Sequence, residues 1–97
     1  MATYIVLGDW TQQGVANFEQ TVDRYDAGMS QMEALGVSVK DRYWTLGSHD
    51  QVSIIDAPND ETLAAAMLKL TSLGSFRTTT LRAFSADEMR AVVAKAS

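Results

Sequence analysis

The 97 residues are enough for one domain, and with 46% hydrophobic and 21% charged residues the composition is typical of a globular protein. Eight Lys and Arg against 12 Asp and Glu give a net charge of −4, and the basic residues are dispersed along the chain, which argues against a nucleic-acid partner. The absence of cysteine excludes disulfides, thiolate catalysis and cysteine-ligated metal clusters.

The first residues, MATYIVLGDW, have no basic region ahead of their apolar residues, so they do not resemble a signal peptide. No apolar run approaches the ~20 residues that are needed to cross a bilayer. We therefore expect a cytoplasmic protein without membrane contact, in which residues 1–97 form a single domain.

A strand and a long helix are predicted in the first third of the chain. Residues 3–9 are mostly β-branched and apolar, which favours a strand. In the segment that follows, large apolar residues recur at spacings of three and four, which is typical of a helix with one buried stripe (Val15, Phe18, Val22, Tyr25, Met29 and Met32). Thr11 is a candidate N-cap and Gly36 a candidate terminator, while Gly14 leaves open whether the regular helix begins later.

Two strands and a second helix are predicted next. Residues 37–46 and 51–57 are strand-like runs that are joined by Gly47-Ser48-His49-Asp50, which indicates a hairpin. Pro58 ends the second run, and the acidic residues after Asn59 favour a helix start. This helix is expected to end at Gly74. Its inner face is expected to carry four large apolar residues (Leu63, Met67, Leu70 and Leu73).

The last part of the chain predicts a Thr-rich strand over residues 76–84 and a terminal helix. Ser85 and Glu88 have the spacing of a capping box, and apolar residues follow them at helical spacing. The order is therefore β-α-β-β-α-β with a short C-terminal helix. This order predicts an α+β fold of the ferredoxin-like type, with helices on one face of a four-stranded antiparallel sheet.

The sheet face opposite the helices is not predicted to be a good solvent surface. Strands with one wet face alternate apolar and polar residues, but the first strand is apolar at both parities. In the last strand we expect Leu81 and Ala83 to face the helices, and the alternate residues to face away from them (Thr78, Thr80, Arg82 and Phe84). The pattern predicts self-association through the sheet, and a monomer that exposes a few hydrophobic residues is the alternative.

Several separated motifs make the chain resemble the GYD domain family, a family of small prokaryotic proteins of the dimeric α/β-barrel type. They span nearly the whole chain (Trp10-Thr11, Gln13-Gly14, Leu46-Gly47, Leu73-Gly74, Arg77-Thr78, Thr80-Leu81 and Arg82-Ala83-Phe84). The name-giving Gly-x-Tyr-Asp signature departs at one position, because His49 replaces its tyrosine while Gly47 and Asp50 remain.

The resemblance implies a ferredoxin-like fold whose sheets pair into a barrel, and hence a homodimer or an assembly of dimers. The wider superfamily contains cofactor-independent monooxygenases, lactone isomerases and haem-dependent enzymes, as well as members without an established activity. A shared fold does not carry a function with it, so the resemblance leaves the question of catalysis open.

His49 and Asp50 are the candidate catalytic residues. Histidine is a common general base in proteins, so the imidazole of His49 suits proton transfer, and Asp50 lies beside it in the hairpin. Turn chemistry explains both equally well, since a short acidic side chain in a turn bonds free backbone N–H groups. With one histidine and no cysteine we expect no metal site and no cofactor, although a haem needs only a single protein ligand.

The candidate ligand-binding residues are aromatic and basic. Trp10, Tyr43 and Trp44 lie near strand ends, where they would line a pocket and stack on a planar organic molecule, or serve as ordinary packing. Arg77 and Arg82 would hold a carboxylate by paired hydrogen bonds, or form ion pairs within the protein.

Two functions therefore remain open. In the first, the protein binds a small organic ligand, with or without oxygenase- or isomerase-like turnover. In the second, it is a non-enzymatic structural or regulatory assembly protein whose sheet face serves only oligomerisation.

Overall fold

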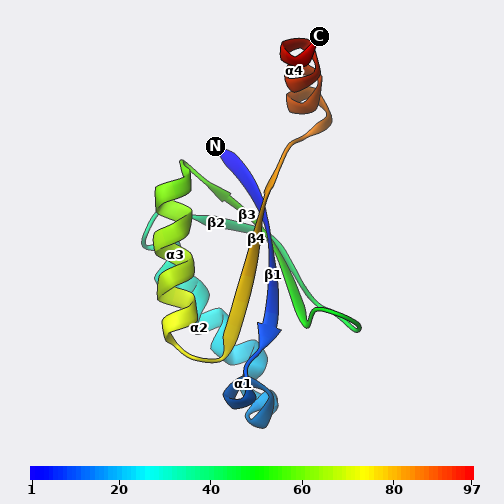
Figure 1. The fold of residues 1–97 in the computed structure, drawn as a ribbon. Helices are drawn as coiled ribbons and strands as arrows, with labels where there is room; N and C mark the ends of the chain where they lie inside the picture. The colour runs from blue at the N-terminus through cyan, green and yellow to red at the C-terminus, as the bar shows by residue number, and fades with distance from the viewer.

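The computed structural model describes residues 1–97. Its sheet has four strands in the order β2-β3-β1-β4, and every neighbouring pair is antiparallel. The central strand β1 (Ala2–Trp10) lies between β3 (Gln51–Ala57) and β4 (Phe76–Ala83), and β2 (Ser38–Trp44) forms the other edge (Figure 1). The predicted ferredoxin-like α+β fold is confirmed, and it is the fold of dimeric α/β-barrel proteins.

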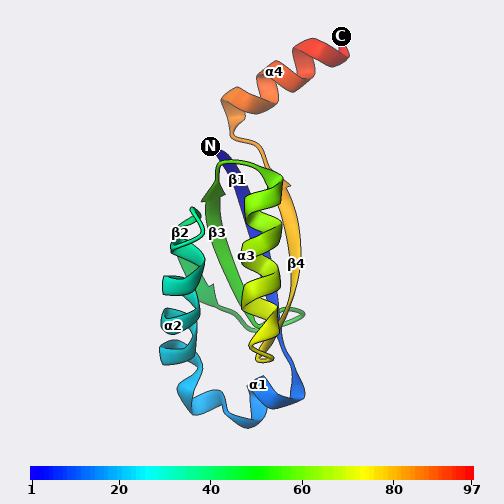
Figure 2. The ribbon, with the colours of Figure 1, turned by 90° about the vertical axis from the view of Figure 1, so that its left-hand side faces the viewer.

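Two helices of equal length form the second layer. α2 (Thr21–Glu33) and α3 (Asp60–Ser72) run side by side over one face of the sheet (Figure 2). The Asn59 side chain caps α3 by accepting a hydrogen bond from the Thr62 N–H at 2.8 Å. No helix covers the other face, which we call the open face of the sheet.

The segment predicted as one helix from Thr11 is broken into three pieces. α1 (Gln12–Ala16) ends at Asn17, where φ −111° and ψ 35° are not helical, and a short 3-10 turn, η1 (Phe18–Gln20), precedes α2. The apolar stripe is therefore split: its last three members are buried and its first three are exposed (Tyr25, Met29 and Met32; Val15, Phe18 and Val22).

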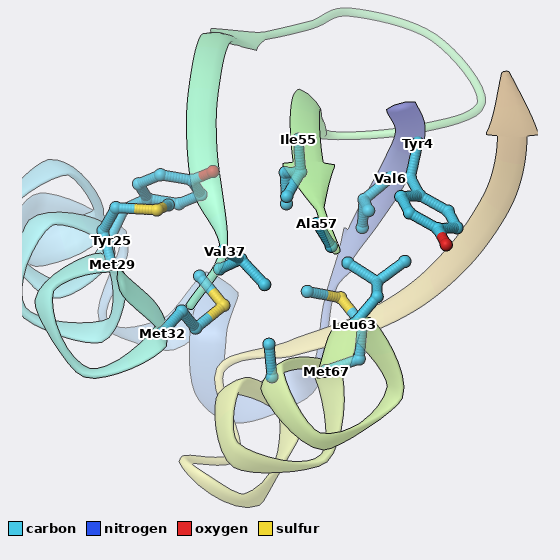
Figure 3. Close-up of a cluster of buried hydrophobic side chains, with 11 residues drawn as sticks. Tyr4, Val6, Tyr25, Met29, Met32, Val37, Ile55, Ala57, Leu63 and Met67 are labelled. Carbon is cyan, nitrogen blue, oxygen red and sulfur yellow. The ribbon is translucent and has the colours of Figure 1, made fainter. Parts of the chain in front are cut away.

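The hydrophobic core lies between the sheet and the two long helices. Val6 and Ile55 point from the sheet toward Leu63 and Met67 of α3 and Met32 of α2 (Figure 3). Met32 is fully buried, in keeping with the ability of methionine to fill irregular gaps. The predicted inner face of α3 is confirmed at Leu63 and Met67, whereas Leu73 at its end is exposed.

The strand register shows which residues share the open face. Ile5 of β1 lies opposite both Ile54 of β3 and Leu81 of β4, so these three side chains point away from the helices. The prediction for β4 was therefore wrong. Leu81 and Ala83 lie on the open face, and the alternate residues of β4 share the helix side with Tyr4 and Val6 (Thr78, Thr80 and Arg82).

α4 (Ala86–Ala96) projects beyond the end of the sheet (Figures 1 and 2). Its predicted capping box is confirmed: the Ser85 hydroxyl accepts from the Glu88 N–H at 3.1 Å, and the Glu88 carboxylate accepts from the Ser85 N–H at 2.9 Å. The hydrogen bond from the Ser85 backbone lowers the pKa of Glu88. The apolar side of α4 is exposed (Met89, Val92 and Val93).

None of the helices has the length and apolar character needed to cross a membrane.

Candidate functional site

The loop between β2 and β3 folds back onto the end of β1. The Asp50 N–H donates to the Gly8 carbonyl at 2.9 Å, and the Asp50 carboxylate accepts from the Trp10 N–H at 2.9 Å. Within the loop, the Thr45 hydroxyl donates to the His49 carbonyl at 2.6 Å, and Gly47 has a φ of +108°. Asp50 thus holds a backbone donor of β1, and a catalytic role for its carboxylate remains a prediction.

His49 is paired with an acid that sequence reasoning did not connect to it. Its Nδ1 lies 3.1 Å from an oxygen of Asp9, and both side chains are partly exposed. Asp9 lies opposite Arg77 in the register of β1 and β4. With its proton on Nδ1, the imidazole donates to Asp9 and leaves Nε2 free to accept a proton, which is the arrangement of an oriented general base.

Trp10 lies at the same end of the sheet, opposite Phe76. Its indole N–H is buried and has no hydrogen-bond partner in the chain. Its ring approaches α1, because a Cβ placed on Gly14 would lie 3.2 Å from the Trp10 Cδ1. The fold therefore brings four predicted site residues to one end of the sheet, together with Asp9 (Trp10, His49, Asp50 and Arg77). Trp10 has the parity of the helix side, whereas Asp9 and Arg77 have that of the open face.

Tyr43 and Trp44 belong to different faces. Tyr43 lies opposite Val52 on the open face and is half exposed. Trp44 lies on the helix side, where its ring packs edge to face against Tyr25 at 5.6 Å and its Nε1–H donates to the Thr21 hydroxyl at 3.1 Å. Trp44 is thus partly buried against the core, and the two aromatic residues do not line one pocket in the single chain.

Arg82 lies at the opposite end of the sheet from His49. Its guanidinium stacks 5.6 Å from the Tyr4 ring centre and 4.6 Å from that of Phe84, donates to the Thr3 carbonyl at 3.2 Å and lies 3.8 Å from the Glu88 carboxylate. The predicted site residues therefore do not converge on a single site.

Tyr4, next to Arg82, donates its hydroxyl hydrogen to the Asp60 carboxylate. This hydrogen bond is the main reason that the pKa of Tyr4 is raised. The hydrogen bond from the phenol also links the start of α3 to β1.

The structure also contains a cavity that sequence reasoning missed. It lies between α2, α3 and the turn before β4, has a volume of about 360 Å³ and has a mixed lining that includes Arg24, Leu70, Leu73, Ser75 and Phe76. These residues come from three separate segments, and no local motif marks them.

A buried polar cluster lies beside this cavity. Tyr25 bonds the Ser53 hydroxyl, and the Gln51 amide donates to the same hydroxyl at 2.9 Å. Gln51 and Ser53 have the same parity in β3 as the buried Ile55 and Ala57. Polar residues at these alternating positions were the feature of the sequence that could have predicted the buried cluster.

The model of the GYD domain family matches residues 4–93, nearly the whole chain. The chain belongs to the GYD domain family. A relative from Thermus thermophilus, named a glutamine synthetase and cystathionine beta-lyase binding protein, is 37% identical over 84 residues, which cover 86% of this chain and 88% of the relative.

Solved structures are similar to this GYD protein over most of its length. A crystal structure of a protein from Thermus thermophilus is 26% identical and has a TM-score of 0.58, covering 89% of this chain and 96% of that chain. A 5-chloro-2-hydroxyhydroquinone dehydrochlorinase from Burkholderia phenoliruptrix is 15% identical with a TM-score of 0.60, covering 90% of this chain and 97% of that chain. At 15% identity this second likeness concerns the fold alone.

Proposed function

We propose that this GYD protein is a homodimer, or an assembly of dimers, that works as a non-enzymatic binding protein for metabolic enzymes. The observation that carries the proposal is the apolar open face of the sheet. Large side chains from all four strands lie on it without cover from the chain's own helices (Ile5, Leu7, Tyr43, Val52, Ile54 and Leu81).

Covering this face with a second copy of the chain is more favourable in free energy than leaving it in contact with water. Apolar surface that leaves water contributes about 25 cal/mol per Å², and patches of this kind on a small domain usually serve as interfaces. Face-to-face pairing of identical sheets is isologous, so each apolar strand contributes to the interface twice. A barrel formed in this way also agrees with the fold type of the chain.

Binding to another protein is supported by two further observations. The Thermus relative carries the name of a binding protein for two enzymes, and it matches most of this chain. α4 exposes a separate apolar stripe beyond the sheet, formed by Met89, Val92 and Val93. An amphipathic helix of this kind is a common element for docking into a groove of a partner.

The proposal is tested by measuring the mass of the protein in solution and its binding to purified enzymes. Sedimentation equilibrium should give twice the 10.6 kDa mass of one chain, or an even multiple of it. The immobilised protein should then bind purified glutamine synthetase or cystathionine β-lyase from its own organism. Replacing both Val92 and Val93 with Gln should weaken that binding at least tenfold, whereas Ala91→Gln on the opposite side of α4 should not.

Two results would count against the proposal in different ways. A monomer at micromolar concentration would contradict the assembly. A dimer that binds neither purified enzyme, or that binds equally after the Val92 and Val93 replacements, would contradict the role given to α4.

Catalysis on a small organic substrate is the second candidate, and the 3.1 Å contact of His49 with Asp9 favours it. In this alternative His49 accepts a proton from an electron-rich substrate, with Tyr43 and Arg77 of the open face as binding groups near the barrel rim. His49→Phe should then lower the rate of hydroquinone oxidation in air at least tenfold, while Ser48→Ala should not. Equal rates for wild type and His49→Phe would exclude this role.

A further inference from the structure

We propose that the cavity between α2 and α3 binds a small organic carboxylate that has an apolar body. The cavity volume of about 360 Å³ falls within the range of small-molecule sites. It opens on the helix side of the sheet, so it is separate from the open face and from the His49 loop. The inference goes beyond the proposed function and does not depend on it.

Arg24 supplies the charged end of the site. One of its guanidinium nitrogens donates to the Ser75 hydroxyl at 3.0 Å, and no carboxylate of the chain lies within ion-pair distance of it. A guanidinium has five N–H donors in a planar fork that matches a carboxylate. The bond to Ser75 fixes the side chain at the cavity while most of these donors stay available.

The apolar end of the site is formed by Leu70, Leu73 and Phe76. Gly28 keeps this end open, because a Cβ at that position would already lie 3.3 Å from the Leu70 Cδ1. The Tyr25 hydroxyl is occupied by its bond to Ser53, so Tyr25 presents a wall without a free polar group. Arg24 is thus the only charged residue of the lining, and the apolar residues favour an aromatic or branched hydrocarbon group.

The ligand class follows from this division. A dicarboxylate would place its second charge in a lining that holds no second cation, since Gln13 and Gln31 are neutral amides and the remaining wall is largely apolar. A neutral apolar molecule would give the N–H donors of Arg24 that do not bond Ser75 no acceptor. A monocarboxylate of the size of phenylacetate satisfies both ends.

The experiment is an NMR titration of the full-length, ¹⁵N-labelled protein with phenylacetate, isovalerate and hexanoate. At least one should produce saturable shifts at the amides of Gly28 and Ser75, and phenylacetamide, which lacks the charge, should not. Arg24→Gln should weaken binding at least tenfold. Arg90→Gln, which removes an exposed arginine of α4, should leave the affinity unchanged.

A second variant tests the interior of the cavity. Gly28→Leu should abolish the shifts at Ser75 by filling the space, and a thermal melt will show whether the variant is folded. The proposal is overturned if none of the three carboxylates gives saturable shifts at millimolar concentration. It is also overturned if phenylacetamide binds as well as phenylacetate, or if Arg24→Gln retains the affinity of the wild type.

Discussion

Replacing Leu81 with Lys is expected to convert the dimer into a folded monomer. Leu81 is 46% exposed in the single chain, so a charged side chain at this position disturbs the fold little. In the paired sheets the change occurs in both copies, and each loses the burial of a leucine, which contributes about 1.5–3 kcal/mol. We therefore expect the dissociation constant to rise by more than about a hundredfold.

Sedimentation velocity over a range of concentrations measures this change, and circular dichroism verifies that the variant is folded. Leu68→Lys is the matched control, because Leu68 is 72% exposed on α3, on the other side of the molecule from the open face. It should keep the wild-type mass. An unchanged mass for Leu81→Lys would mean that the open face is not the dimer interface.

The second large effect is expected at Gly14. A Cβ at this position would lie 2.1 Å from the Ser75 carbonyl oxygen and 3.0 Å from its carbonyl carbon, so backbone would have to move. The Ser75 carbonyl cannot withdraw freely, because it accepts a hydrogen bond from the Thr11 N–H at 3.1 Å. Gly14→Ala should therefore lower the free energy of unfolding by about 3 kcal/mol, at the upper end for overpacking.

Urea denaturation followed by circular dichroism measures the loss. Gly28→Ala serves as the control, since its Cβ would meet only the movable ends of the Leu70 and Leu73 side chains. In addition, alanine favours the interior of a helix by up to about 1 kcal/mol over glycine. The control should be as stable as the wild type or slightly more stable. If Gly14→Ala were equally stable, α1 would have to lie farther from Ser75 than the structure places it.

Local signals predicted most of the fold. The capping box of Ser85 and Glu88, the glycine at position 74 and the strand of residues 51–57 act through neighbouring residues, and the structure confirms them. The helix break at Asn17 was harder, because the apolar spacing continues across it. α1 packs closely against Trp10 and Ser75, a long-range contact that apolar spacing along the chain does not reveal.

The orientation of β4 could not be read from its residue types. When both faces of a sheet carry apolar groups, parity shows which residues share a face but not which face the helices cover. Leu81 looked like a core residue for that reason, whereas Thr80 and Arg82 lie on the helix side. The apolar side of β4 faces away from the helices and belongs to the proposed dimer interface.

The candidate sites depend on register and tertiary contacts still more strongly. His49 meets Asp9 only because the hairpin loop bends back to β1, 40 positions earlier in the chain. Arg24 and Ser75 are 51 positions apart, and neither belongs to a recognisable motif. The sequence offered the single histidine as a candidate, but it held no clue to the pairing or to the cavity.

The place of β1 in the centre of the sheet has a consequence for synthesis in the cell. β1 is made first, yet its second neighbour, β4, is made last, since Tyr4 pairs with Arg82. Until residues 76–83 have been translated, β1 keeps an unpaired edge of backbone donors and acceptors, a state that is prone to aggregation. Folding of the nascent chain must therefore wait for its last strand, so that the newly made protein depends on rapid closure or on chaperones.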